Sequence, residues 1–168
     1  PKMNRNALLA GFLVAIVVSP SARGLDPRRS VTQHGQDLWQ TEQGLPQERV
    51  NALLESREGY LWIGTMSGLA RFDGARFVRF DRSRGLTDNR VRAIAQAADG
   101  SLWVGAEKGV TRIRDGVAET WGTREGLSDE VVWTILADAG GTVWIGTENG
   151  LNWITGGRVA VLGRKDGL

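Results

Sequence analysis

Cysteine is absent from the 168-residue sequence, and histidine occurs once, at His34. Without cysteine the chain can form no disulfide, no thiolate metal site and no cysteine nucleophile. One histidine leaves a zinc site without its usual set of ligands, and it gives no basis for a Ser-His-Asp catalytic group. The sequence therefore predicts no metal, no cofactor and no catalytic residues in this chain.

A strong charge of either sign is also missing, because 21 lysine and arginine residues face 19 aspartate and glutamate residues. Three of the basic residues, Lys2, Arg5 and Arg23, precede residue 25, and every acidic residue follows it. Without that leader the chain has 18 basic and 19 acidic residues, a net charge of −1. We therefore expect no nucleic-acid partner.

The sequence has no apolar run of the length that normally crosses a membrane. Residues 7–18 are uncharged and mostly apolar, but twelve residues are few against the roughly 20 that span a bilayer. Lys2 and Arg5 precede this run, and a proline and small residues follow it up to Gly24. This layout predicts a helical secretory signal peptide cleaved near Gly24, with an uncleaved anchor as the alternative. The protein is then exported to the periplasm or beyond.

Glycine and tryptophan, by contrast, are abundant and regularly spaced, with 23 and 7 copies. Gly-Leu pairs recur every 41 residues, beginning at Gly44, Gly85, Gly126 and Gly167. The same shift aligns further residues of the three repeats, namely Val50, Val91 and Val132, Trp62, Trp103 and Trp144, and Gly64, Gly105 and Gly146. A fixed period near 40 residues is typical of solenoids and propellers.

Each repeat has three glycine-containing turn signals, which predict four short antiparallel strands. In the first repeat we expect strands at residues 50–56, 60–65, 69–72 and 76–81, with Val50, Ala52 and Leu54 on one buried face. No convincing helical stripe follows the leader. Four strands in about 40 residues make one blade of a β-propeller, so the fold is predicted to be all-β.

The predicted organisation is a signal peptide, a linker and a partial propeller. The expected bounds are 1–24 for the signal peptide, 25–35 for the linker and 36–168 for the propeller, with blades at about 44–84, 85–125 and 126–166. Trp39 stands one period before Phe80, so residues 36–41 are predicted to form an orphan outer strand. Three blades cannot close a ring. We therefore expect further blades of the same chain to follow, and an exposed flank that associates readily.

One string in each repeat resembles the two-component regulator propeller repeat. The strings are Gly59-Tyr60-Leu61-Trp62-Ile63-Gly64-Thr65-Met66-Ser67-Gly68-Leu69, Gly100-Ser101-Leu102-Trp103-Val104-Gly105-Ala106-Glu107-Lys108-Gly109-Val110 and Gly141-Thr142-Val143-Trp144-Ile145-Gly146-Thr147-Glu148-Asn149-Gly150-Leu151. One departure is Ala106, where the other two strings have threonine. The resemblance implies the periplasmic region of a sensor that is anchored in the inner membrane, dimeric when full length, and coupled to a histidine kinase or a diguanylate cyclase.

Candidate site residues divide into packing and binding groups. The repeated tryptophans Trp62, Trp103 and Trp144 can grip a sugar ring, but their repetition favours packing between blades. Ligand contacts are expected in loops that differ between blades, and the candidates are Arg49, Arg90, Lys108, Glu148 and Asn149. The basic members suit a small anionic ligand such as an acidic saccharide, with solvated loop charges as the alternative interpretation.

Three functions remain open from sequence. We favour the ligand-sensing region of a bacterial two-component or cyclic-dinucleotide receptor. The alternatives are an exported carbohydrate- or protein-binding propeller without a signalling output, and a propeller hydrolase.

Overall fold

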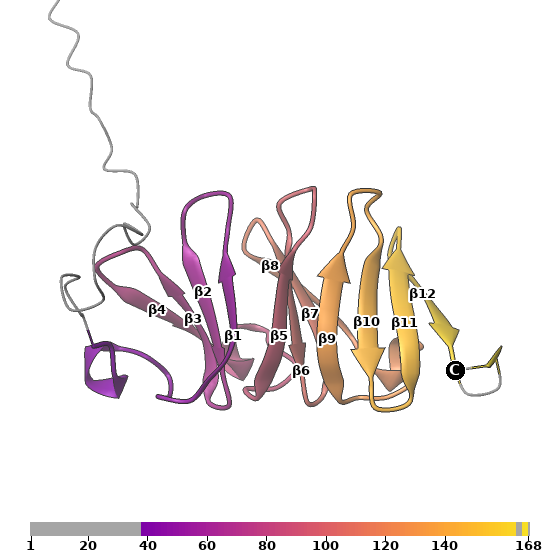
Figure 1. Ribbon diagram of the computed structural model, residues 1–168, viewed down its shortest axis with the longest axis horizontal. Coiled ribbons are helices and arrows are strands. Elements are labelled where there is room, and N and C mark those ends of the chain that lie inside the picture. Colours follow the sequence, from indigo (N-terminus) through magenta and orange to yellow (C-terminus); the bar gives the residue numbers. More distant parts are fainter. Residues whose placement is uncertain (1–37, 164–165, 168) are drawn as a thin grey trace, which may run out of the picture. The chain divides into compact units, whose positions relative to one another are not determined.

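The computed structural model describes residues 38–163 and 166–167, and within them twelve strands form three antiparallel sheets (Figure 1). Each sheet has four strands, and neighbours in the sheet are consecutive in the chain. The first sheet contains β1 (Val50–Glu55), β2 (Leu61–Thr65), β3 (Gly68–Phe72) and β4 (Phe77–Phe80). The second contains β5 (Val91–Gln96), β6 (Leu102–Ala106), β7 (Gly109–Arg114) and β8 (Val117–Trp121). The third contains β9 (Val132–Ala137), β10 (Val143–Thr147), β11 (Gly150–Thr155) and β12 (Arg158–Leu162).

The predicted all-β architecture of three four-stranded antiparallel sheets is confirmed. Each strand end of the first sheet lies within one residue of its predicted position. The predicted signal peptide and linker lie outside the described residues. The predicted outer strand, residues 36–41, is described only from residue 38 onward and is not confirmed there. Residues 38–40 belong to no strand, and the Trp39 ring packs on Phe72 and Phe77 of the first sheet, with centroid distances of 4.8 and 5.6 Å.

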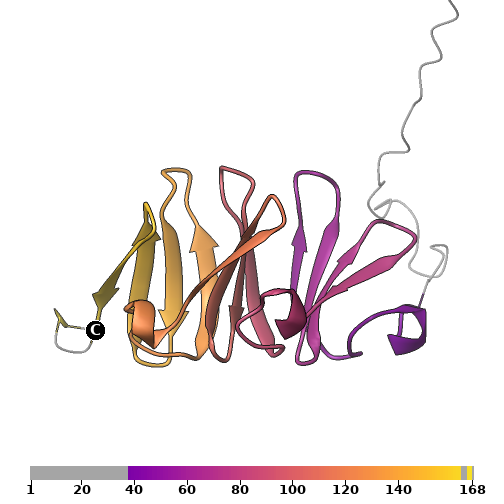
Figure 2. The same cartoon turned by 180° about the vertical axis from the view of Figure 1, so that it is seen from behind.

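The repeated Gly-Leu pairs end single turns of 3₁₀ helix, which the sequence analysis did not predict. The turns are η2 (Thr41–Gln43), η3 (Arg82–Arg84) and η4 (Thr123–Glu125), and they lie along one edge of the sheets (Figure 2). Gly85 closes η3 with a φ of 92°, in the left-handed region that glycine adopts without strain. The next residue, Leu86, is buried at 5% exposure and anchors the turn to the core between the first two sheets.

The sheets stack face to face through clusters of apolar side chains. Between the second and third sheets the core includes Trp103, Trp121 and Val132, and Trp103 and Trp121 stack with their centroids 5.1 Å apart. Trp103 is 5% exposed, and its indole Nε1 donates to Ser101 Oγ at 3.1 Å. The indole thus satisfies its one polar group inside the core.

The other two repeated tryptophans are partly exposed. Trp62 packs beside the core between the first two sheets. Trp144 is half-buried and packs on Trp153 at 5.5 Å, and its Nε1 donates to Asp138 Oδ2 at 3.0 Å. Trp144 and Trp153 lie on the third sheet, on the face turned away from the second.

A β-bulge at the start of each first strand corrects one prediction. Val50 pairs with Thr65 and Ala52 with Gly64, so that Asn51 is an extra residue between them. Val50 and Ala52 therefore lie on opposite faces of the sheet, not on the shared face expected from simple alternation, because a bulge reverses the alternation. The same irregularity lies between Val91 and Ala93 in the second sheet and in the pairing of β9 with β10 in the third.

Across residues 38–163 and 166–167, no helical segment has the length and apolar character that crossing a bilayer requires.

Candidate functional site

The loops of the three sheets gather at two opposite edges. The connector edge, at the bottom of Figure 1, carries the 3₁₀ turns and the β2–β3, β6–β7 and β10–β11 turns. The hairpin edge, at the top, carries the turns between the first two and the last two strands of each sheet. The five ligand-binding candidates from sequence, Arg49, Arg90, Lys108, Glu148 and Asn149, all belong to segments of the connector edge.

The side chains at the bulge positions differ from blade to blade, and they lie at the connector edge. Asn51, Arg92 and Trp133 occupy equivalent positions, 41 residues apart, but differ in chemistry. The side chain of Asn51 reaches the next sheet, where its Nδ2 donates to the Val91 carbonyl at 3.0 Å. Bulges direct side chains away from the regular faces of a sheet. A constant scaffold therefore presents three different groups at one kind of position.

A chain of polar contacts links the second and third sheets along the connector edge. Arg90 Nε lies 3.0 Å from Asp88 Oδ1, and its Nη1 lies 2.5 Å from Glu107 Oε2. The other oxygen of Glu107 lies 2.5 Å from Arg92 Nη2. The Arg92 guanidinium in turn covers the Trp133 ring at 4.1 Å from its centroid, a cation–π contact.

The chain ends in the third sheet, where Trp133 Nε1 donates to Glu148 Oε2 at 2.7 Å. Trp133 is 50% exposed. Next to it, Asn149 Nδ2 donates to Asp129 Oδ2 at 2.6 Å. Three of the sequence candidates, Arg90, Glu148 and Asn149, are thus engaged by other side chains of the protein.

The remaining candidates, Arg49 and Lys108, are exposed and have no ion pair or side-chain hydrogen bond with any described residue. The structure does not gather the five candidates into a common cavity. Two cavities lie instead at the hairpin edge.

Two cavities open at the hairpin edge, each between neighbouring sheets. The first cavity, between the first and second sheets, has a volume of about 490 Å³, and residues at its wall include Glu58, Tyr60, Trp62, Arg71, Gln96 and Asp99. The second cavity, between the second and third sheets, has a volume of about 380 Å³, and its wall includes Ser101, Trp103, Arg112, Trp121, Gly140 and Ile154. Both volumes fall within the range of about 300–1,000 Å³ that is usual for small-molecule sites.

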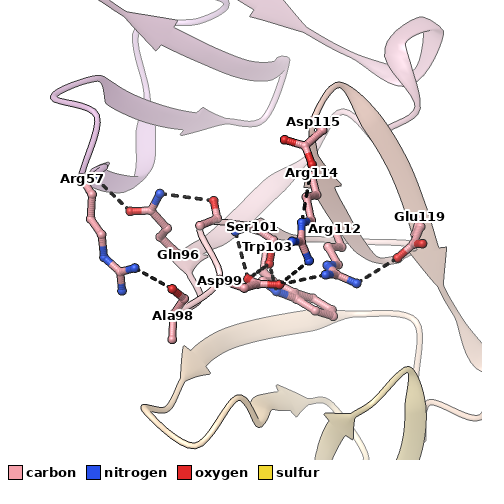
Figure 3. A network of polar contacts seen from close by, with 11 residues as sticks. Arg57, Gln96, Ala98, Asp99, Ser101, Trp103, Arg112, Arg114, Asp115 and Glu119 are labelled. Carbon is pink, nitrogen blue, oxygen red and sulfur yellow. Dashed lines mark hydrogen bonds and ion pairs between the residues drawn. The ribbon is translucent and has the colours of Figure 1, made fainter.

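Asp99 lies at the wall of both cavities and is the hub of a polar network (Figure 3). Its Oδ1 accepts from the Ser101 backbone N–H at 3.0 Å and from the Ser101 hydroxyl at 2.6 Å. Its Oδ2 lies 2.9 Å from Arg112 Nη2 and 3.1 Å from Arg114 Nη1. The hydrogen bonds from Ser101, followed by the interaction with Arg112, lower the pKa of Asp99 to about 2.

Equivalent arginines in the two cavities have different partners. Arg112 is held between Asp99 and Glu119, the latter at 3.2 Å, and lies over the Trp103 ring at 5.9 Å. Arg71, one period earlier, lies over Trp62 at 6.0 Å and over Tyr60 at 4.3 Å. Among the described residues it has no ion pair or hydrogen-bond acceptor, and its buried Nε is unsatisfied, as is that of Arg112.

The sequence explains this difference between Arg71 and Arg112, although we did not predict it. In β7 and β8, Arg112 pairs across the strands with Glu119, and in β3 and β4 Arg71 pairs with Val78. A valine thus stands where the second sheet has a carboxylate. The 41-residue shift brings Glu119 onto Val78, so the substitution is visible in the sequence once the strand register is known.

No group of three histidine, cysteine, aspartate or glutamate side chains is placed to hold a metal ion in the part of the chain that the structure describes.

Three four-stranded antiparallel sheets, formed in succession and packed face to face, define part of a β-propeller. Three segments of the chain, residues 44–67, 85–108 and 126–149, match the two component regulator propeller family. The repeat region of this chain belongs to that family. No curated protein sequence matches the chain.

Solved structures with the same fold include two extracellular domains from B. thetaiotaomicron. The domain assigned to the hybrid two component system BT3049 is 20% identical, with a TM-score of 0.71 over 79% of this chain. The domain assigned to the hybrid two component system BT4673 is 24% identical, with a TM-score of 0.61 over 70% of this chain. The chain spans 19% of the length of each of these structures.

The structure of a lyase is also similar in fold. An inactive variant of virginiamycin B lyase from Staphylococcus aureus, solved with quinupristin, is 17% identical, with a TM-score of 0.58 over 71% of this chain and 43% of that one. Such identities establish a common fold, and they leave the activity of this chain to be argued from its own residues.

Proposed function

We propose that this chain is part of the extracytoplasmic, ligand-sensing region of a bacterial two-component or cyclic-dinucleotide receptor. The observation that carries the proposal is the match of all three repeats to the two component regulator propeller family. The likeness in fold to extracellular domains assigned to hybrid two component systems is consistent with it.

The arrangement of the loops supports a role in recognition. The backbone repeats with little change, while equivalent positions carry different side chains, such as Asn51, Arg92 and Trp133. A rigid scaffold with variable loops is the usual design of a binding surface. On the connector edge, Arg49 and Lys108 are exposed and suited to contact an anionic ligand. Arg90 can bind such a ligand only if it releases Asp88 or Glu107.

In this proposal, further blades of the same chain complete the propeller, and a membrane segment connects it to a cytoplasmic kinase or cyclase. Ligand binding between blades then shifts their packing or the geometry of a receptor dimer, and so biases the output domain. The apolar residues on the outer face of the third sheet, including Leu136 at 64% exposure, provide a surface for the next blade.

The gene beyond residue 168 tests the proposal. We expect it to encode more propeller repeats, a membrane-spanning helix and then a histidine kinase or diguanylate cyclase. A stop codon soon after the ring is complete would reject the receptor and leave an exported binding propeller. If an output domain is present, its activity in membranes should change with ligand, and deletion of residues 44–166 should abolish that response.

A further inference from the structure

We infer that the first cavity at the hairpin edge binds a hydroxylated monocarboxylate, such as a hexuronic acid unit of a saccharide, with Arg71 as its anchor. As a statement about the ligand that is sensed, this inference rests on the proposed function. As a statement about a binding site, it rests on the geometry of the cavity alone.

The charge of Arg71 is unmatched among the described residues. Its guanidinium is partly buried against Tyr60 and Trp62, and it has no acceptor among the described residues. The buried Nε–H has lost water without gaining a hydrogen bond, which is costly, and the charge has no counterion among the described residues. Arg112 in the next sheet also has an unsatisfied Nε, but its Nη2 and Nη1 are paired with Asp99 and Glu119. A ligand carboxylate would give Arg71 the same kind of partner.

The other charged groups at the cavity wall each have a partner in the protein. Glu58 accepts from Gln96 Nε2 at 3.1 Å, and Asp99 is bound by Arg112 and Arg114. The carboxylate of Asp115 lies 3.6 Å from Arg114. Arg71 is therefore the cation left without a counterion among the described residues of this wall. The carboxylates around it repel ligands of high negative charge and accept hydrogen bonds from hydroxyl groups, which favours a single carboxylate combined with hydroxyls.

The shape and lining of the cavity also suit a small hydroxylated ring. The cavity of about 490 Å³ is wide enough for a small ligand. Besides the polar groups, its wall contains Tyr60, Trp62, Leu102 and Ile113. Aromatic and aliphatic walls beside convergent polar groups suit a pyranose, which has one face of C–H groups and a rim of hydroxyls. A hexuronic acid combines this ring with one carboxylate.

The test is titration of the full chain with D-glucuronate and with D-glucose, followed by calorimetry or by tryptophan fluorescence. We expect saturable binding of glucuronate and at least about tenfold weaker binding of glucose, since one charge-assisted pair distinguishes them. Arg71→Gln should weaken glucuronate binding by about tenfold or more for the same reason. The matched control is Arg82→Gln, which makes the same change in η3 at the connector edge and should leave the affinity unchanged.

A second variant tests the same site without removing the arginine. Val78→Glu places at the first sheet the carboxylate that Glu119 provides in the second. We expect it to pair with Arg71, to keep the chain folded and to weaken glucuronate binding about as much as Arg71→Gln does. Equal affinity for glucose and glucuronate, no saturable binding of glucuronate, or full affinity in both Arg71→Gln and Val78→Glu would each overturn the inference.

These outcomes are separate from those of the proposed function. If glucuronate binds through Arg71 but no membrane helix or output domain follows in the gene, the site stands and the receptor is rejected. If an output domain follows but glucuronate does not bind, the receptor stands and the site is rejected.

Discussion

Val132 fills the space that a side chain at Gly105 would occupy, because a Cβ added to Gly105 would lie 2.5 Å from Val132 Cγ1. The same relationship joins Gly64 and Val91 across the previous pair of sheets, at 2.6 Å. Since neither glycine has a positive φ, glycine is required at these positions by close approach of the next sheet, not by backbone conformation.

Gly105→Ala should therefore destabilise the chain by about 1–3 kcal/mol, the usual cost of overpacking a core. The measurement is the free energy of unfolding from urea titration. Gly163→Ala is the matched control, because no atom lies within 4 Å of a Cβ at that position and its φ is not positive. The double variant Gly105→Ala/Val132→Ala should lose less stability than the sum of the two single losses, because the smaller side chain at position 132 makes room for the added methyl group. Additive losses in the double variant would contradict direct contact between the two positions.

The carboxylate of Asp99 should make stability depend on acid pH. Hydrogen bonds from Ser101 and the interaction with Arg112 lower its folded-state pKa from 3.8 to about 2. A carboxylate whose pKa is lowered on folding stabilises the fold above its unfolded pKa, and this contribution is lost as the pH falls from about 4 to about 2. Asp99→Asn should remove that part of the pH dependence, which urea titrations of both proteins between pH 2 and 5 can detect.

Titration of the Asp99 carboxyl by NMR would also separate the causes of the shift. Ser101→Ala should raise the pKa of Asp99 more than Arg112→Gln does, because it removes the hydroxyl bond, which is the largest single cause of the shift, while the backbone N–H bond of residue 101 is kept. A larger rise in Arg112→Gln would show that the ion pair, and not the serine, controls this group.

Glu107 should matter more to stability than Glu119, although both form ion pairs with arginine. The side chain of Glu107 is 17% exposed and joins two guanidinium groups, those of Arg90 and Arg92. The side chain of Glu119 is 55% exposed, and its partner Arg112 also has Asp99. We expect Glu107→Gln to cost about 1–2 kcal/mol, because it leaves the partly buried Arg92 without its carboxylate and close to the exposed Arg90, and Glu119→Gln to cost less than about 0.5 kcal/mol. Equal losses in the two variants would mean that the connector-edge contacts are merely solvated surface pairs.

The arrangement of strands could be predicted because its determinants are local and repeated. Glycines at the turns fix where strands end, and in the first repeat the strand limits then follow from the residues between them. The bulge at Asn51, Arg92 and Trp133 could not be predicted in this way. A bulge changes which residue of one strand faces which residue of another, and the alternation of apolar residues in a single strand does not reveal that pairing.

The candidate site was harder to predict than the fold. The differences between the loops led to the prediction of a site at the connector edge. Two of the candidates there, Arg90 and Glu148, are engaged by other side chains of the protein. The contrast between Arg71 and Arg112 depends on which residue each faces across the strands. Comparison of the repeats shows Val78 at the position of Glu119, but only the strand pairing connects that difference to Arg71.

Successive blades pack face to face, and the indole of Trp103 is enclosed between the second and third. The most direct measurement compares the free energies of unfolding of Trp103→Ala and Trp133→Ala with that of the unaltered chain. Trp103 is 5% exposed and Trp133 is 50% exposed, so we expect a loss of about 3–5 kcal/mol for the first and about 1 kcal/mol for the second, from its cation–π contact and hydrogen bond. A loss below about 1 kcal/mol for Trp103→Ala, in the range of surface substitutions, would contradict this packing of the blades.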